Sequence, residues 1–211
     1  METLQHHGKP KNSGSKRFFE NPVLENLTRT HISIPILIFI SIAVGLLYYA
    51  IIHTNLSLEF IPFLFLSGWL FFTLIEYVAH RFLFHMHTSS ELEKKIQYGM
   101  HGIHHEYPKD KDRLAMPPPM SLVLLGLVFI IFYTLLDTEV FGFLPGFLSG
   151  YATYLFVHYL VHAYPPPKNF FKQLWINHSI HHYKDDDVAF GVSSPLWDYV
   201  FETMPKKGKG L

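Results

Sequence analysis

Four long apolar runs constrain the fold of this 211-residue chain more than any other feature. They predict transmembrane helices at residues 32–52, 58–84, 120–136 and 140–162, since a helix needs about 20 apolar residues to cross the hydrocarbon core of a bilayer. A soluble helical bundle is the alternative, but these runs are apolar on all sides and leave no polar face for water. Only 16% of the residues are charged, which also favours a membrane protein.

The seventeen Lys and Arg residues fall into three parts of the sequence. Five precede Ile32, six lie between Arg81 and Arg113, and six follow from Lys168 onward. Neither of the short loops between the apolar runs, around Asn55 and between residues 137 and 139, contains a basic residue. The positive-inside rule therefore predicts that the N-terminus, the long middle loop and the C-terminal region all lie on the cytoplasmic side.

The predicted fold is an all-α membrane protein with one cytosolic N-terminal tail and one domain. The tail is polar and covers residues 1–31, and the domain covers residues 32–211. Residues 85–117 and 163–205 are expected to form a helical cap on the cytoplasmic side. Because seventeen acidic residues balance the seventeen basic ones, the charge gives no indication of a nucleic-acid partner.

Ten of the fifteen histidines occur in four closely spaced clusters on the predicted cytoplasmic side. Two clusters are pairs at the ends of apolar runs, and two are copies of the pattern HxxHH. The ten are His80, His85, His101, His104, His105, His158, His162, His178, His181 and His182. Since the chain has no cysteine, a metal here must be held by nitrogen and oxygen ligands. The histidines without such spacing, which are not expected to bind metal, are His6, His7, His31, His53 and His87.

Helix geometry indicates which of these histidines can bind the same metal ion. His101 and His105, four residues apart, lie on one helical face, whereas the adjacent His104 and His105 point about 100° apart. His80 and His85 diverge by about 140° on an ideal α-helix, so either the helix loosens there or the pair approaches the site from its rim. Ten imidazoles exceed the six ligands of an octahedral ion, and two metal ions are therefore expected.

All-imidazole coordination suits iron, with zinc as a competitor. Polar groups beside the ligands are expected to hold the imidazole rings in place. The best-placed candidate is Glu76, one helical turn before His80, followed by Asn177 and Asp198.

The histidine segments resemble a known family of membrane enzymes. Four segments resemble the integral-membrane fatty acid hydroxylase/sterol desaturase superfamily, and most closely the fatty acid 2-hydroxylases. They are EYVAHRFLFHM, MHGIHHEYPKDKDRLAMPPPMSLV, HYLVH and NHSIHHYKDDDVAFGVSSPLWDYVFETMP. The resemblance implies a four-helix membrane anchor, a cytosolic cap and a diiron centre, in which zinc can replace iron. It also implies a reaction in which O2 and two electrons insert a hydroxyl at the 2-position of a free or ceramide-bound fatty acid.

The resemblance implies partners as well. The lipid substrate is expected to enter from the bilayer, with Tyr151 and Tyr154 as candidate substrate contacts, although both could be ordinary lipid-facing aromatics. Leu155 stands where relatives commonly carry an Asp. Electrons are expected from a separate protein similar to cytochrome b5 or ferredoxin. The chain itself is expected in a bacterial inner membrane or, alternatively, in the endoplasmic reticulum.

Other functions fit parts of the pattern. Within the same superfamily, a sterol oxidase or desaturase and a carotenoid hydroxylase are alternatives, but the segment FGVSSPLWDYVF favours the acyl 2-hydroxylases. A membrane metal carrier is a third possibility. It would usually place ionisable residues within its spans, whereas residues 32–58 and 120–136 contain no charged residue.

Overall fold

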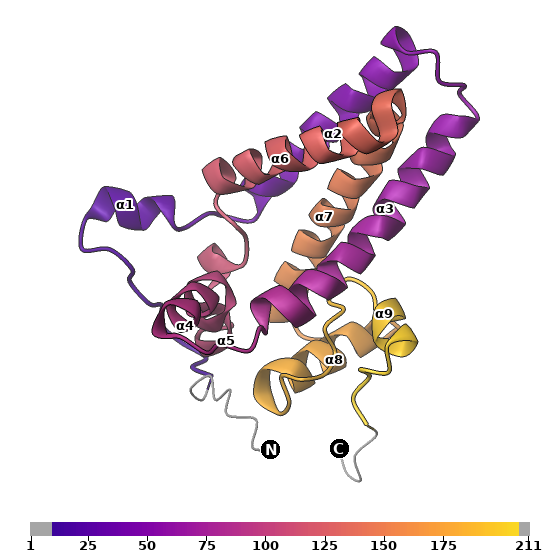
Figure 1. Ribbon diagram of the computed structural model, residues 1–211. Helices are drawn as coiled ribbons and strands as arrows, with labels where there is room; N and C mark the ends of the chain where they lie inside the picture. The colour runs from indigo at the N-terminus through magenta and orange to yellow at the C-terminus, as the bar shows by residue number, and fades with distance from the viewer. Residues whose placement is uncertain (1–9, 207–211) are drawn as a thin grey trace. The chain divides into compact units, whose positions relative to one another are not determined.

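The computed structural model describes residues 10–206, and this part of the chain forms helices and loops without any β-strand. The long helices, labelled in Figure 1, are α2 (Ser33–His53), α3 (Phe60–Val78), α6 (Pro118–Leu136) and α7 (Val140–Ala163). The shorter α-helices are α1 (Pro22–Leu27), α4 (Glu91–Gln97), α5 (Ile103–Glu106), α8 (Lys172–Tyr183) and α9 (Leu196–Val200). Two π-helices, η1 (Ala79–Phe84) and η2 (Tyr98–Gly102), and two 3₁₀ turns, η3 (Lys111–Arg113) and η4 (Asp137–Glu139), join them. The predicted all-helical fold is confirmed for the described residues.

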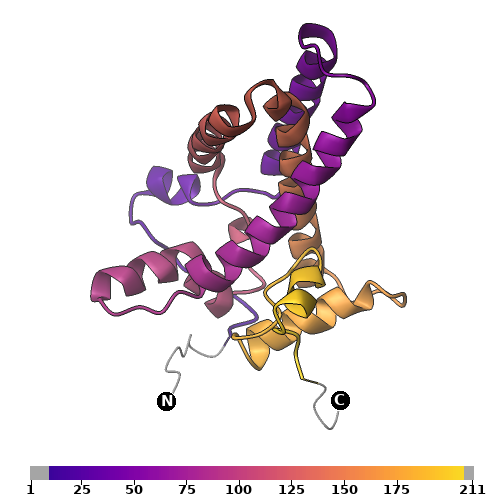
Figure 2. The same ribbon diagram turned by 45° about the vertical axis from the view of Figure 1, so that its right-hand side comes forward.

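Three segments are long and apolar enough to cross a membrane. They are Ser33–His53, Phe60–Phe84 and Lys111–Ala163. The third is 53 residues long and contains two helices, α6 and α7, which Figure 2 shows as separate elements. The chain turns between them at Asp137, whose φ is 46°. Three candidate spans are therefore found where the sequence predicts four helices, and the difference lies in this one long segment.

The described residues divide into two compact units made of interleaved segments. We call residues 10–17, 76–111 and 157–206 the histidine unit, because all ten clustered histidines belong to it. Residues 18–75 and 112–156 form the apolar unit. The predicted polar tail contributes helix α1 to the apolar unit, where Asn21 caps the helix and Pro22 occupies its first turn. Residues 1–9 of that tail lie outside the described part of the chain.

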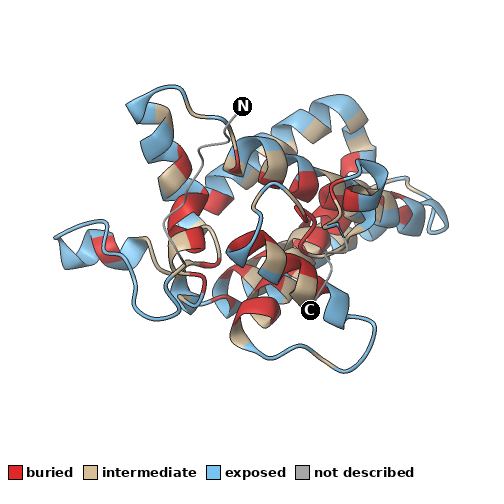
Figure 3. Cartoon of the chain, turned by 90° about the horizontal axis from the view of Figure 1, so that it is seen from below, coloured by how far each residue is buried: buried red, intermediate tan, exposed pale blue. Residues whose placement is uncertain are grey.

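The apolar unit is built around a cluster of buried side chains from α2, α3 and α7. Its members are Phe39, Ala43, Phe72, Val140, Leu144, Phe147 and Leu148. Helix α6 packs on this cluster with partly buried residues that include Val128 and Phe132. The opposite sides of α2 and α6 are exposed and apolar, with Leu37 and Val123 as examples. Figure 3 shows the exposed residues of the described chain in pale blue and the buried ones in red. Exposed apolar surface of this extent is typical of helices that contact lipid.

Two glycines allow α3 and α7 to pack backbone to backbone. A Cβ on Gly146 would overlap the carbonyl oxygen of Phe65, and one on Gly68 would overlap that of Phe143. Small residues at such crossings are characteristic of packed membrane helices.

We expect Gly146→Ala to lower the stability of the protein by about 1–3 kcal/mol, because backbone atoms at this crossing cannot move aside for a methyl group. Thermal unfolding in detergent measures the effect. Gly126→Ala on α6 is the matched control, since no atom lies within 4 Å of a Cβ added there. The control should keep or raise the melting temperature, because Ala favours helix over Gly by about 0.5–1 kcal/mol. Equal losses in both variants would contradict the close packing of α3 on α7.

Candidate metal centre

A π-helix at the end of α3 brings His80 and His85 to the same side of the chain. Residues 79–84 form η1, and the His85 amide donates to the His80 carbonyl oxygen at 3.2 Å, the i to i+5 pattern of a π-helix. The two ring centroids lie 5.2 Å apart. The helix therefore loosens here, which is one of the two arrangements that the spacing of the pair predicts.

The structure gathers the ten clustered histidines into two groups of five. Within each group, one ring nitrogen per residue lies within 4.8 Å of the others. Group one consists of His80, His85, His101, His105 and His181, and group two consists of His104, His158, His162, His178 and His182. All ten side chains are buried. The exposed His31, His53 and His87 belong to neither group, and His6 and His7 lie outside the described residues.

The two HxxHH segments are shared between the groups in opposite ways. In the first segment, the outer pair His101 and His105 joins group one and His104 joins group two. In the second segment, on α8, the outer pair joins group two and the inner His181 joins group one. This follows from helix geometry, because residues four apart share a face while adjacent residues diverge.

Within each group, Nε2 atoms approach one another closely. In group one, His101 Nε2 lies 3.1 Å from His80 Nε2 and 3.0 Å from His105 Nε2. In group two, the His104–His158 distance is 3.0 Å and the His158–His162 distance is 3.2 Å. Two imidazole nitrogens, each about 2.1 Å from one ion, are about 3.0 Å apart when they bind at a right angle. The spacings therefore fit nitrogens that converge on a common ion in each group.

Backbone carbonyl groups fix the orientation of two rings in group one. His80 Nδ1 lies 2.6 Å from the Phe190 carbonyl oxygen, and His181 Nδ1 lies 2.8 Å from the Val188 carbonyl oxygen. A carbonyl oxygen only accepts hydrogen bonds, so both Nδ1 atoms must carry the proton. Each Nε2 atom is then left with a lone pair that can bind metal.

The chemistry of the remaining nitrogen atoms also fits metal ions. Both ring nitrogens of His182 and Nε2 of His181 are buried and have no hydrogen-bond partner within residues 10–206. An unpaired buried polar atom costs about 1–3 kcal/mol, and a metal–nitrogen bond would remove this cost at one nitrogen of each ring. Burial, followed by the nearby imidazoles, holds the pKa of His104 and His182 well below the ordinary value. These rings are therefore neutral at pH 7, as metal ligands must be.

Two buried carboxylates hold the loop that carries these carbonyl groups. Asp198 accepts hydrogen bonds from the amides of Phe190 and Gly191 at 2.9 Å and 2.8 Å. Glu76 accepts from the amides of Val192 and Ser193 at 2.7 Å and 2.8 Å. Four consecutive amides thus donate to two carboxylates, and the Ala189 amide donates to the Thr203 carbonyl oxygen. We call residues 188–193 the carboxylate-held loop.

The polar residues predicted beside the ligands form hydrogen bonds of their own. Glu76 and Asp198 accept hydrogen bonds from the loop and from side chains beside it, and their predicted role in holding the imidazole rings stays a prediction. Asn177 is buried, and its side-chain oxygen accepts from Gln173 at 2.6 Å. Its recorded contacts join it to Gln173 and to the Met204 sulfur, and its predicted role beside the ligands stays a prediction.

The predicted substrate residues belong to the other unit. Tyr151 and Tyr154 pack against the Phe72 ring with centroid distances of 5.7 Å and 6.3 Å. Leu155 is buried. The part of these tyrosines in substrate binding stays a prediction.

The residues that sequence reasoning missed act through their backbone. Val188 and Phe190 supply carbonyl oxygens to His181 and His80, and side-chain identity gives no signal for such a contact. The Phe190 ring also lies 5.7 Å, between centroids, from each of His80, His85 and His181. Gly191 also matters, since a Cβ there would overlap the Ser194 carbonyl oxygen and lie 2.8 Å from Asp198 Oδ2; its only signal in the sequence is that it is a glycine.

Known proteins resemble this chain over most of its length. A family model described as fatty acid hydroxylase matches residues 64–203. The chain is 36% identical to dihydroceramide fatty acyl 2-hydroxylase FAH2 of Arabidopsis thaliana, over 90% of this chain and 80% of that protein. It is 41% identical to fatty acid 2-hydroxylase of Mus musculus, over 67% of this chain and 39% of that protein.

A solved structure has the same fold. It is described as full length scs7p with only the hydroxylase domain visible, and it aligns with a TM-score of 0.84 at 34% identity. The alignment covers 92% of this chain and 73% of that one. The chain spans most of the plant relative but well under half of the mouse relative.

Proposed function

The chain belongs to the fatty acid hydroxylase family, and we propose that it is a membrane-embedded acyl 2-hydroxylase. It uses O2 to place a hydroxyl on the 2-position of a fatty acid or of the acyl chain of a ceramide. The observation that carries this proposal is the pair of five-histidine groups in a member of this family. The names of the plant and mouse relatives support acyl chains as the substrate class.

The ten grouped histidines are the proposed ligands of two metal ions. Iron in both groups would supply the activation of O2 and the removal of a hydrogen from the 2-position. Zinc binds similar ligands and can occupy the sites in a purified sample.

The protein orients the ligands and keeps water away from them. His80 and His181 hold their protons at Nδ1 and present Nε2, which prevents either ring from turning over. Burial of all ten histidines limits the access of water to the proposed metal ligands, which protects oxygen chemistry there from side reactions with solvent.

Residues 32–211 form the proposed hydroxylase domain, with four membrane crossings. A single helix of 53 residues would be far longer than the roughly 20 residues that a span requires, which supports separate crossings by α6 and α7. The distribution of basic residues supports cytoplasmic positions for both termini and for a cap formed by residues 85–117 and 163–205.

The remaining partners follow from the reaction. The lipid enters from the bilayer, and a separate protein similar to cytochrome b5 or ferredoxin delivers the electrons. The proposed location is a bacterial inner membrane, with the endoplasmic reticulum as the alternative, since the plant and mouse relatives are eukaryotic proteins.

Lipid mass spectrometry of cells that express the chain tests the function. We expect new acyl species heavier by one oxygen atom, with the hydroxyl placed at the 2-position by fragmentation. His181→Ala should abolish them, because it removes a ligand of group one, whereas the exposed His87→Ala should not. Oxygenated sterols or carotenoids in place of 2-hydroxy acyl chains would contradict the proposed substrate class.

A further inference from the structure

Helix α1 and Phe19, which lies three residues before it, expose apolar side chains that the rest of their unit does not cover. Phe19, Val23, Leu24 and Leu27 are all exposed, Val23 by 67% and Leu27 by 56%. We call these four side chains the α1 apolar face. Isolated exposed apolar residues are common in proteins, but four large ones within nine positions form a patch of the kind that marks an interaction surface.

The helix is amphipathic despite its short length. At 100° per residue, Val23, Leu24 and Leu27 fall within an arc of about 100°, and Glu25 and Asn26 lie outside it. Glu25 is buried and Asn26 is exposed, so the apolar face points away from the buried side. This pattern is typical of helices that lie in a membrane interface.

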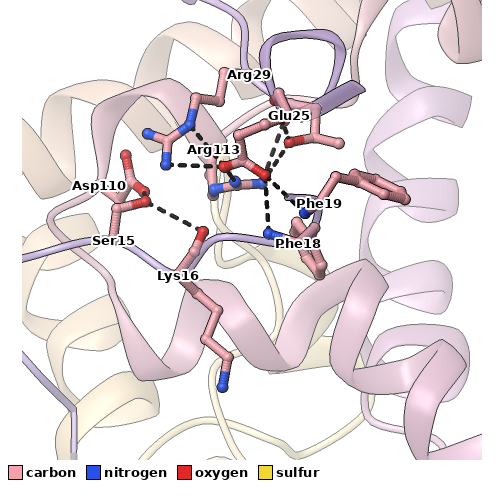
Figure 4. Close-up of polar contacts among 9 residues, drawn as sticks. Ser15, Lys16, Phe18, Phe19, Glu25, Arg29, Asp110 and Arg113 are labelled. Atoms are coloured by element: carbon pink, nitrogen blue, oxygen red, sulfur yellow. Dashed lines mark hydrogen bonds and ion pairs between the residues drawn. The ribbon is translucent and has the colours of Figure 1, made fainter. Parts of the chain in front are cut away.

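A buried carboxylate fixes the orientation of this segment (Figure 4). Glu25 accepts hydrogen bonds from the amides of Phe18 and Phe19 at 2.8 Å and 3.2 Å. It also forms ion pairs with Arg29 at 3.1 Å and with the buried Arg113 at 2.5 Å. Burial alone would raise the pKa of Glu25, but the two amides and the two guanidinium groups hold it at about 2. The carboxylate therefore stays charged at neutral pH and keeps the apolar face turned outward.

The segment lies at the end of the apolar unit where α2 and α6 begin. The Thr30 amide, just before α2, donates to the Asp112 carbonyl oxygen at 2.9 Å, and Arg113 directly follows Asp112 in the stretch before α6. The first turns of these helices expose further apolar side chains, among them Ile34 and Met120. The α1 apolar face thus lies at the same end of the unit as the exposed apolar side chains at the starts of α2 and α6.

We propose that Phe18–Leu27 is an interfacial anchor, with the α1 apolar face inserted among the lipid headgroups of the bilayer that α2 and α6 cross. The charges in the sequence complement such a surface, since the basic residues Lys16 and Arg17 directly precede the segment. Basic residues beside an apolar helix face bind anionic headgroups. The anchor holds the entry points of α2 and α6 together at the membrane surface. It does not depend on the hydroxylase activity of the protein.

Site-directed spin labelling of the full chain in lipid nanodiscs tests this proposal. The chain has no native cysteine, so Leu24→Cys and Asn26→Cys each give a single labelling site, one on the apolar face and one beside it. We expect the ratio of collisions with O2 to collisions with a water-soluble nickel chelate to be about threefold or more higher at position 24, because O2 concentrates in the apolar layer. Equal ratios at the two positions would overturn the proposal, and so would protection of position 24 from both reagents, which would indicate a protein partner.

A second variant tests whether Glu25 sets the orientation. Glu25→Ala in the Leu24→Cys protein removes the carboxylate that holds the amides of Phe18 and Phe19. We expect the label to become more mobile. The difference between positions 24 and 26 in the ratio of O2 collisions to nickel-chelate collisions should fall by half or more. An unchanged spectrum would show that Glu25 does not hold the anchor in place.

Discussion

His104→Ala and His105→Ala should each remove about one of two bound metal ions, and the double variant should remove nearly all metal. The two residues are neighbours in the sequence, yet the first belongs to group two and the second to group one. Each single variant should lower the yield of 2-hydroxy product at least about 100-fold. Removing a residue that only hydrogen-bonds to a metal ligand already lowers metal affinity or activity about 10–100-fold in many metal sites. Metal analysis of the purified protein and lipid mass spectrometry measure the two effects separately.

His87→Ala is the matched control, because this residue lies two positions after His85 but is exposed and outside both groups. It should keep the metal content and the product. Full metal content in His104→Ala would contradict the assignment of group two as a metal site. Loss of both ions in either single variant would show that the two groups bind as one coupled site rather than as two.

The grouping of the histidines could be predicted from the sequence, because metal ligands need a specific side chain at a specific helical spacing; their role as ligands stays a prediction. The separation of His104 from His105 follows from the 100° step of an α-helix, and the structure places them in different groups. The pair His80 and His85 could not be settled in this way, since the loosening of η1 depends on the packing around it and not on the pair itself.

Other features had no reliable signal in the sequence. Glu76 could be recognised as a buried carboxylate near the ligands, but its partners, the amides of Val192 and Ser193, lie more than a hundred residues away in the chain. Helix α1 was hidden in a segment that looks polar overall, because its capping residue and its four apolar side chains occupy only a few positions.

The second large effect is expected for Asp198→Asn, which disturbs the carboxylate-held loop. Asp198 is fully buried and accepts from two backbone amides and from the Thr203 hydroxyl at 2.7 Å. An Asn side chain places an NH2 group where one of these donors points, so a buried amide loses its partner at a cost of about 1–3 kcal/mol. The Phe190 carbonyl oxygen should then no longer be held firmly against His80.

We therefore expect Asp198→Asn to release metal to a chelator about 10–100-fold faster, the range found when the outer partners of metal ligands are removed. Activity should fall by a similar factor. The exposed neighbour variant Tyr199→Phe is the control and should match the unmodified protein. A variant that unfolds more easily but releases metal at the normal rate would show that Asp198 stabilises the loop without orienting His80.

Glu76→Gln provides the test of whether both carboxylates act through the same loop. Glu76 holds the amides of Val192 and Ser193, and Asp198 holds those of Phe190 and Gly191, so the two variants disturb adjacent residues. Mutations that share a structural element are not additive, with coupling free energies of about 0.5–3 kcal/mol. The double variant should accordingly release metal more slowly than the product of the two single effects predicts, since the first change already frees the loop. Full additivity would mean that Glu76 and Asp198 act on the histidines by independent routes.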